Sequence, residues 1–203
     1  MIETKDNKNA YLGNPLLKRA NVSQNWTKKQ LLEYSKCMED PLFFIQNYVK
    51  IVSLDEGLVP FKMYDFQKEM VGTFHSNRFT ICKLPRQSGK STIMISYLLH
   101  YALFNDSVNI AILANKASTA RDLLGRLQLA YENLPNWLQQ GVMSWNKGSL
   151  ELENGSKILA SSTSASAVRG GSYLTSLRMY HPMLLNNFLV LYILPSHQVK
   201  LQK

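Results

Sequence analysis

The sequence is poor in the features that define several protein classes. Its only two cysteines, Cys37 and Cys82, lack metal-ligand spacing, so neither a zinc site nor a disulfide framework is predicted. The longest apolar run, residues 183–194, is interrupted by two asparagines and is too short to cross a bilayer. We therefore expect a globular protein with reduced thiols and no membrane partner.

Acidic residues are scarce, and they are missing from one end of the chain. The 203 residues carry a formal net charge of +9, and no Asp or Glu follows Glu153. A basic protein favours polyanionic partners, of which nucleic acid is the usual one. The length fits one sizeable domain with an appendage.

Hydrophobic periodicity predicts helices first and an alternation of strands and helices afterwards. Residues 1–25 are polar and are expected to form a loosely held arm. Apolar spacing, a capping Thr27 and a terminating Pro41 predict the first helix. The further elements expected are amphipathic stretches at 41–52 and 61–76, a strand at 78–84, a buried helix at 92–105, a strand at 109–115, a helix at 116–135, and a hairpin at 149–163 turning at Asn154-Gly155. Such an alternation is typical of a parallel sheet covered by helices.

The segment KLPRQSGKST, residues 83–92, lies between the predicted strand and the buried helix. It ends like a phosphate-binding loop, although Leu84 stands where the first glycine of that motif is expected. Gly89 would let the backbone approach phosphates, Lys90 would contact the β- and γ-phosphates, and Ser91 would ligate Mg²⁺. We therefore predict ATP and Mg²⁺ as ligands, with Gln87, Ser88 and Thr92 also in the loop site.

The same residues resemble a known family. LPRQSGKST is similar to the Walker A segment of the large terminase subunit of tailed bacteriophages, in which the first glycine is also replaced. YDFQKEM resembles the adenine-contacting motif of that family, with Tyr64 and Gln67 in its positions. The resemblance continues through NIAILANKASTARDLLGRL, LPNWLQQGVMSWNKGSLELENGS and AVRGGSY, and it covers roughly residues 11–173.

The resemblance implies a viral DNA-packaging motor. The expected fold is a three-layer α/β core of the additional-strand P-loop NTPase class, preceded by a helical N-terminal region. ATP hydrolysis would power DNA translocation, with Arg86 and Lys90 stabilising the transferred charge. The implied partners are double-stranded DNA, the portal protein and the small terminase subunit, and the family forms a homo-oligomeric ring on the portal in the cytoplasm of the infected bacterial host.

The C-terminal part departs from the family pattern. The family continues after AVRGGSY with a strand ending in Asp-Glu, which would hold Mg²⁺ and activate water, and this chain has no acid there. We expect an arm and helical region at 1–60, a partial ATPase core at 61–173 and an aberrant tail at 174–203, with the family's nuclease domain absent. The sheet should be incomplete at its C-terminal end or completed by an imitation strand at 188–194, and hydrolysis should be negligible.

A frameshift is one explanation of this tail. With suitable codons, residues 185–203 read in a shifted frame can spell EQFFSSVYPTISSGKTTK, which resembles the family's continuation. The DNA sequence downstream of codon 173 tests this hypothesis.

Two other functional classes fit some of these features. A helicase-like P-loop ATPase would share the glutamine-containing motif before the loop, but the chain has no helicase-type D-E-x-x motif after the loop. A basic nucleic-acid-binding module without catalysis would bind DNA in a salt-dependent way that nucleotide does not change.

Overall fold

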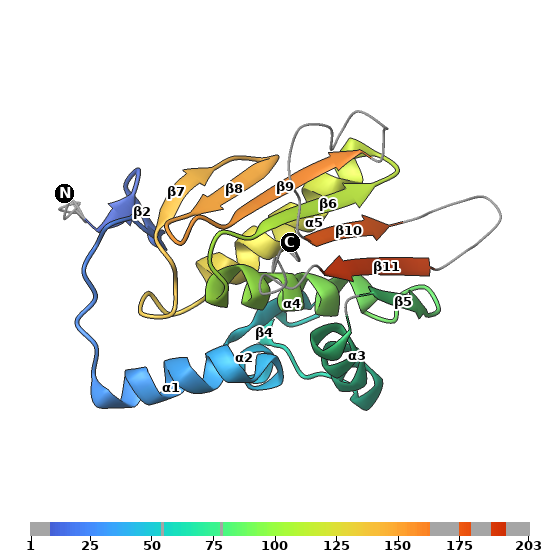
Figure 1. Cartoon of the computed structure of the whole chain (residues 1–203), viewed down its shortest axis with the longest axis horizontal. Helices are drawn as coiled ribbons and strands as arrows, with labels where there is room; N and C mark the ends of the chain where they lie inside the picture. The colour runs from blue at the N-terminus through green and yellow to red at the C-terminus, as the bar shows by residue number, and fades with distance from the viewer. Residues whose placement is uncertain (1–8, 54, 78, 163–174, 180–187, 194–203) are drawn as a thin grey trace, which may run out of the picture.

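The computed structural model describes residues 9–53, 55–77, 79–162, 175–179 and 188–193 (Figure 1). The helices are α1 (Lys28–Glu39), α2 (Pro41–Tyr48), α3 (Asp65–Ser76), α4 (Lys90–Phe104) and α5 (Ala117–Glu132). The strands are β1 (Ala10–Tyr11), β2 (Asn14–Lys18), β3 (Lys50–Ser53), β4 (Gly57–Pro60), β5 (Phe79–Lys83), β6 (Asn109–Ala114), β7 (Val142–Trp145), β8 (Ser149–Leu152), β9 (Lys157–Ser162), β10 (Thr175–Met179) and β11 (Phe188–Ile193). The α/β class expected from the sequence is confirmed, and no described helix is long and apolar enough to cross a membrane.

One seven-stranded sheet forms the frame of the molecule, in the order β5-β11-β10-β6-β9-β8-β7. Strand β6 pairs in parallel with both β9 and β10, and β11 runs antiparallel to β10 and to β5. It follows that β5, β10, β6 and β9 all point the same way, so their carboxyl ends share one edge of the sheet. Ligand sites of open α/β sheets lie outside that edge.

Two outcomes were expected for the C-terminal end of the sheet, and the topology corrects the first, a missing strand, and agrees with the second, an imitation strand at 188–194. Residues of the expected aberrant tail supply β10 and β11, and both strands lie inside the sheet between β5 and β6. Strand β11 begins where the imitation strand was expected, but it is antiparallel to its neighbours. Among the described strands, β5 pairs with β11 on one side and with none on the other, so it forms an edge of the sheet. Its Phe79 and Ile81 side chains remain 62% and 66% exposed.

Side-chain caps start the first two helices, α1 and α2. Thr27 caps α1 as expected, through a reciprocal capping box with Gln30. Pro41 separates the first two helices as predicted and is itself the first residue of α2, where its missing N–H costs nothing. Helix α4 is buried along most of its length and packs against α2, α3 and α5. The N-terminal helical region and the sheet domain therefore share one hydrophobic core.

The β8–β9 hairpin confirms the strand pair expected at 149–163, with Gly155 at a φ of +79°. The connection is longer than the two-residue turn expected, since it covers residues 153–156.

The N-terminal segment is held more firmly than its polar composition indicates. Strands β1 and β2 form a hairpin, and Arg19 makes a parallel bridge to Val142 on the outer edge of β7. Gln139, which is 3% exposed, accepts a hydrogen bond from the Lys18 backbone N–H and donates one to the carbonyl of Leu16. Residues 9–21 are thus docked, and the expectation of a loose arm across 1–25 is wrong for them. The sequence gives no sign of this contact, because Lys18 and Gln139 lie more than a hundred residues apart.

A buried histidine gives the core a pH dependence. His100 is 3% exposed, and its Nε2 lies 2.7 Å from the carbonyl oxygen of Cys37. Its Nδ1 has no hydrogen-bond partner among the described residues, so the ring fits its surroundings in the neutral form. Desolvation by burial lowers the pKa of His100 to about 4.

Acidification should therefore destabilise the protein through His100. Below the ordinary histidine pKa of about 6.5, this histidine is protonated in the unfolded chain. In the folded chain it stays neutral until the pH approaches 4, so protonation favours the unfolded state. Stability is retained above pH 6.5 and should fall by about 2.5 kcal/mol between pH 6.5 and 4.5 from this group alone. Urea unfolding of His100→Asn should show a decline smaller by that amount.

A matched control is available on the same helix, α4. Ser96 is buried and has no titratable group, so Ser96→Ala should keep the pH slope of the unaltered chain. Equal slopes in the unaltered chain and in His100→Asn would contradict the assignment of this pH dependence to His100.

Candidate functional site

The loop that joins β5 to α4 lies at the carboxyl edge of the sheet. Gly89 is the N-cap of α4 and has the left-handed backbone conformation, with φ +73° and ψ 9°. A left-handed φ of 61° also occurs at Gln87, so the chain turns sharply before the helix starts. The first N–H groups of a helix have no intrahelical partners, and the helix dipole makes this end positive. The loop and the start of α4 together form a site suited to an anion.

The Lys90 side chain folds back over this loop. Its Nζ donates hydrogen bonds to the carbonyl oxygens of Pro85 at 3.0 Å and Leu84 at 3.4 Å. The ammonium group therefore lies beside the turn instead of extending into solvent. A charge placed there is within reach of a group bound in the loop.

Helix α3 holds the loop from its other side. Gln67 donates from Nε2 to the carbonyl oxygen of Ser88 at 3.2 Å, and its Oε1 accepts from the backbone N–H of Tyr64 at 3.0 Å. A Cβ placed on Gly89 would lie only 2.6 Å from Gln67 Nε2. Glycine is required at position 89 both for its φ and for this close approach.

A cavity of about 520 Å³ opens between the loop, the start of α3 and the β3–β4 hairpin. This volume is within the usual range for small-molecule sites. Tyr64 and Phe66 stack in parallel with ring centroids 5.8 Å apart, and both line it. Its lining residues are Ile51, Phe61, Lys62, Tyr64, Phe66, Gln67, Leu84, Pro85, Gln87, Ser88, Gly89 and Thr92.

The structure brings together most of the residues expected at the site. Tyr64, Gln67, Gln87, Ser88, Gly89 and Thr92 all line the cavity. The other three expected residues, Arg86, Lys90 and Ser91, belong to the same loop and helix start but are not part of that lining. Arg86 is exposed.

Six lining residues were not among the expected site residues. Leu84 and Pro85 belong to the loop segment itself, and the other four lie outside it. Ile51 lies in β3, which had been taken as part of an amphipathic stretch, and Phe61 directly follows β4. Lys62 follows that hairpin, and Phe66 lies one residue after Asp65 in the YDF triplet. The aromatic pair in YDF was the one available signal, since two large aromatic side chains exposed at a helix start need a reason.

Carboxylates are the missing component. The strand that should carry the acidic pair is β10, which pairs with β6 and has the sequence TSLRM. The two positions that follow it, 180 and 181, lie outside the described residues, and the sequence has Tyr180 and His181 there. Within the described part of the chain, no group of three or more His, Cys, Asp or Glu side chains could hold a metal ion.

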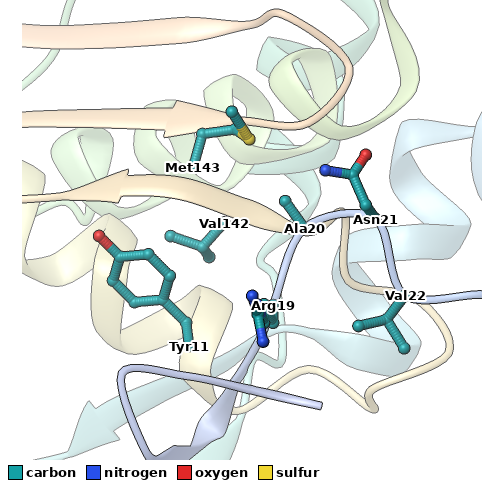
Figure 2. A pocket seen from close by; sticks show the side chains of 7 residues that line it. All are labelled: Tyr11, Arg19, Ala20, Asn21, Val22, Val142 and Met143. Carbon is teal, nitrogen blue, oxygen red and sulfur yellow. The ribbon is translucent and has the colours of Figure 1, made fainter. Parts of the chain in front are cut away.

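A second hollow, of about 390 Å³, lies between the N-terminal hairpin and β7 (Figure 2). Its lining residues are Tyr11, Arg19, Ala20, Asn21, Val22, Val142 and Met143. Arg19 is its one charged side chain, and no helix start faces it among the lining residues. It therefore lacks the anion-binding elements of the loop cavity.

A known family model matches part of the chain. Residues 81–175 match the model of a family described as "Terminase large subunit, T4likevirus-type, N-terminal". The matched range includes the phosphate-type loop, α4, β6 and α5. This match confirms the resemblance to the large terminase subunit that was recognised in the sequence.

Proposed function

We propose that this chain is an ATP-binding part of the large terminase subunit of a tailed bacteriophage, with the fold of a P-loop NTPase of the additional-strand class. The supporting observation is the cavity in which the β5–α4 loop, the positive end of α4 and the Tyr64–Phe66 stack meet. An anion-binding helix start beside exposed aromatic rings fits a nucleotide, which has both a polyphosphate and a base.

The phosphates and the base of the nucleotide would contact different walls of the cavity. The phosphates would lie on the loop, contacted by backbone N–H groups at the start of α4 and by the Lys90 ammonium. Arg86, in the same loop, would add positive charge near the terminal phosphate. The base would lie toward Tyr64 and Phe66, which are 69% and 39% exposed and therefore accessible for stacking.

The donor set fits Mg²⁺ only in part. Ser91, the second residue of α4, would offer one hydroxyl oxygen, and Mg²⁺ takes its other ligands from phosphates and water. The carboxylates that would complete the second shell and activate water have no counterpart after Glu153. We infer that the chain binds nucleotide weakly and hydrolyses it negligibly.

The wider role follows from the family. In the intact motor, hydrolysis would drive double-stranded DNA through a portal, with a small terminase subunit as partner, a homo-oligomeric ring as the working assembly and the cytoplasm of the infected host as the location. The net charge of +9 supports a nucleic-acid partner.

The loop lysine provides the test of nucleotide binding. Lys90→Ala should lower the affinity for Mg·ATP by about 10-fold to 100-fold, because hydrogen bonds to a charged group contribute about 1.5–3 kcal/mol. Isothermal titration calorimetry on the full chain measures the loss. Lys28→Ala is the matched control, since Lys28 is the first residue of α1 as Lys90 is of α4.

Two results would contradict the proposal in different ways. Equal ATP affinity in the unaltered chain and in Lys90→Ala would rule out the loop as the phosphate site. Steady ATP turnover that Lys90→Ala abolishes would keep the site but disprove negligible hydrolysis.

A further inference from the structure

The side-chain amide of Gln67 is held by hydrogen bonds at both of its ends. The residue is 2% exposed although it lies in the cavity wall. Its amide oxygen accepts from the Tyr64 N–H, and its amide nitrogen donates to the Ser88 carbonyl. Both ends of the amide are therefore bonded to the backbone, one at the start of α3 and one in the phosphate-type loop.

These two bonds fix the orientation of the amide. Rotating it by half a turn would place its NH₂ group against the Tyr64 N–H and its oxygen against the Ser88 carbonyl. Two donors would then face each other, as would two acceptors, and buried unpaired groups of this kind are costly. What remains on the amide is one hydrogen and one lone pair, both within a side chain almost fully shielded from the cavity.

Recognition of adenine by a glutamine requires the oxygen and the nitrogen of the side-chain amide. The amide oxygen accepts from the N6 amino group of adenine, and the amide nitrogen donates to N7. Guanine has a carbonyl oxygen at position 6, so a free amide in this orientation separates the two bases. In this chain the two atoms are already bonded to Tyr64 and Ser88.

The apolar residues of the wall and Lys62 do not distinguish adenine from guanine. Ile51, Phe61 and Phe66 offer apolar contact and stacking, which every base accepts. Lys62 can only donate, and N7 is an acceptor in adenine and in guanine alike.

On the premise that nucleotide binds in the loop cavity, we propose that Gln67 is a positioning residue of the phosphate loop and not a reader of the base. It ties the start of α3 to Ser88 and packs against Gly89, which leaves no room for a side chain. The site then accepts ATP and GTP with comparable affinity, and most of the binding comes from the phosphates.

The unaltered full chain provides the first test. Mg·ATP, Mg·GTP and Mg·tripolyphosphate, which has no base, are titrated separately by calorimetry at one salt concentration. We expect the ATP and GTP dissociation constants to agree within about threefold, whereas a bidentate amide–base pair would separate them by roughly 5-fold to 150-fold. An ATP preference of tenfold or more would overturn the inference.

The second test separates loop positioning from base reading. Gln67→Glu keeps the acceptor for Tyr64 but sets an oxygen against the Ser88 carbonyl, so the loop should loosen. The affinities for ATP, GTP and tripolyphosphate should all fall by the same factor, about tenfold. Loss of ATP binding alone, with tripolyphosphate unaffected, would show that Gln67 reads the base.

Gln30→Glu is the matched control. Gln30 has the third position of α1, as Gln67 has in α3, and its Oε1 accepts from the Thr27 N–H at 3.0 Å. This variant alters the same helix-start contact without touching the loop, so all three affinities should stay unchanged. If the unaltered chain binds none of the three ligands, the proposed function itself fails, and this result differs from the selective losses described above.

Discussion

Replacement of Gly89 by alanine should lower the ATP affinity by roughly 100-fold and the free energy of unfolding by about 3 kcal/mol. A side chain at a φ of +73° costs about 1–2 kcal/mol, since only glycine adopts this conformation freely. The added Cβ would also meet Gln67 Nε2 at 2.6 Å and force it off the Ser88 carbonyl, which costs about 1 kcal/mol more. Calorimetry and urea unfolding measure the two effects.

Gly57 separates these two causes. It has nearly the same φ, +72°, but a Cβ there meets nothing within 4 Å. Gly57→Ala should therefore lose about 1–2 kcal/mol of stability and no ATP affinity. In the double variant Gly89→Ala/Gln67→Ala, the clash is removed, so the combined loss should be smaller than the sum of the single losses. Strict additivity would disprove the contact between these two residues.

Phe44→Ala should be the most destabilising single change in the N-terminal region, at about 3–5 kcal/mol. Phe44 is 0% exposed on α2, and its ring lies 5.5 Å from that of His100 and 5.6 Å from that of Phe104, both on α4. The truncation would leave a cavity where α2 packs on the helix that begins at the phosphate loop. Urea unfolding measures the loss.

Phe79→Ala makes the same chemical change at the edge of the sheet. Phe79 is 62% exposed, so its truncation should cost about 1 kcal/mol or less. Equal losses at the two positions would show that α2 does not share a core with α4.

Local patterns predicted most helices and strands because each depends on residues close in sequence. Thr27 with Gln30, the alternation in β5 and the apolar run of β6 all act within one element. Contacts between distant segments left no such signal. The hydrogen bond between Lys18 and Gln139 and the pairing of β11 with β5 both join segments about a hundred residues apart. The first differs from the expected loose arm, and the second differs from the expected parallel sheet.

The site was predictable to the extent that its residues form a contiguous motif. The loop residues were proposed because a phosphate site requires glycine, lysine and hydroxyl groups in a fixed order. Tyr64 was proposed because YDFQKEM resembles a motif of the terminase family. The cavity wall formed by Ile51 and Phe61 was not, because the β3–β4 hairpin reaches the loop only through the tertiary fold. The hydrogen bonds made by both ends of the Gln67 amide could not be predicted either, since a sequence gives the residue type and not the partners of its atoms.

The placement of β11 has a consequence for the order of folding. Among the strands that the structure describes, β5 joins the sheet only through β11, with Phe79 opposite Tyr192 and Lys83 opposite Phe188. The chain between these partners must close a loop of more than a hundred residues, and such contacts form slowly because the entropy of closure comes before any gain. During synthesis, the strand that leads into the phosphate loop leaves the ribosome long before its only neighbour exists. Until that neighbour is made, β5 exposes an unpaired strand edge, and such edges favour aggregation.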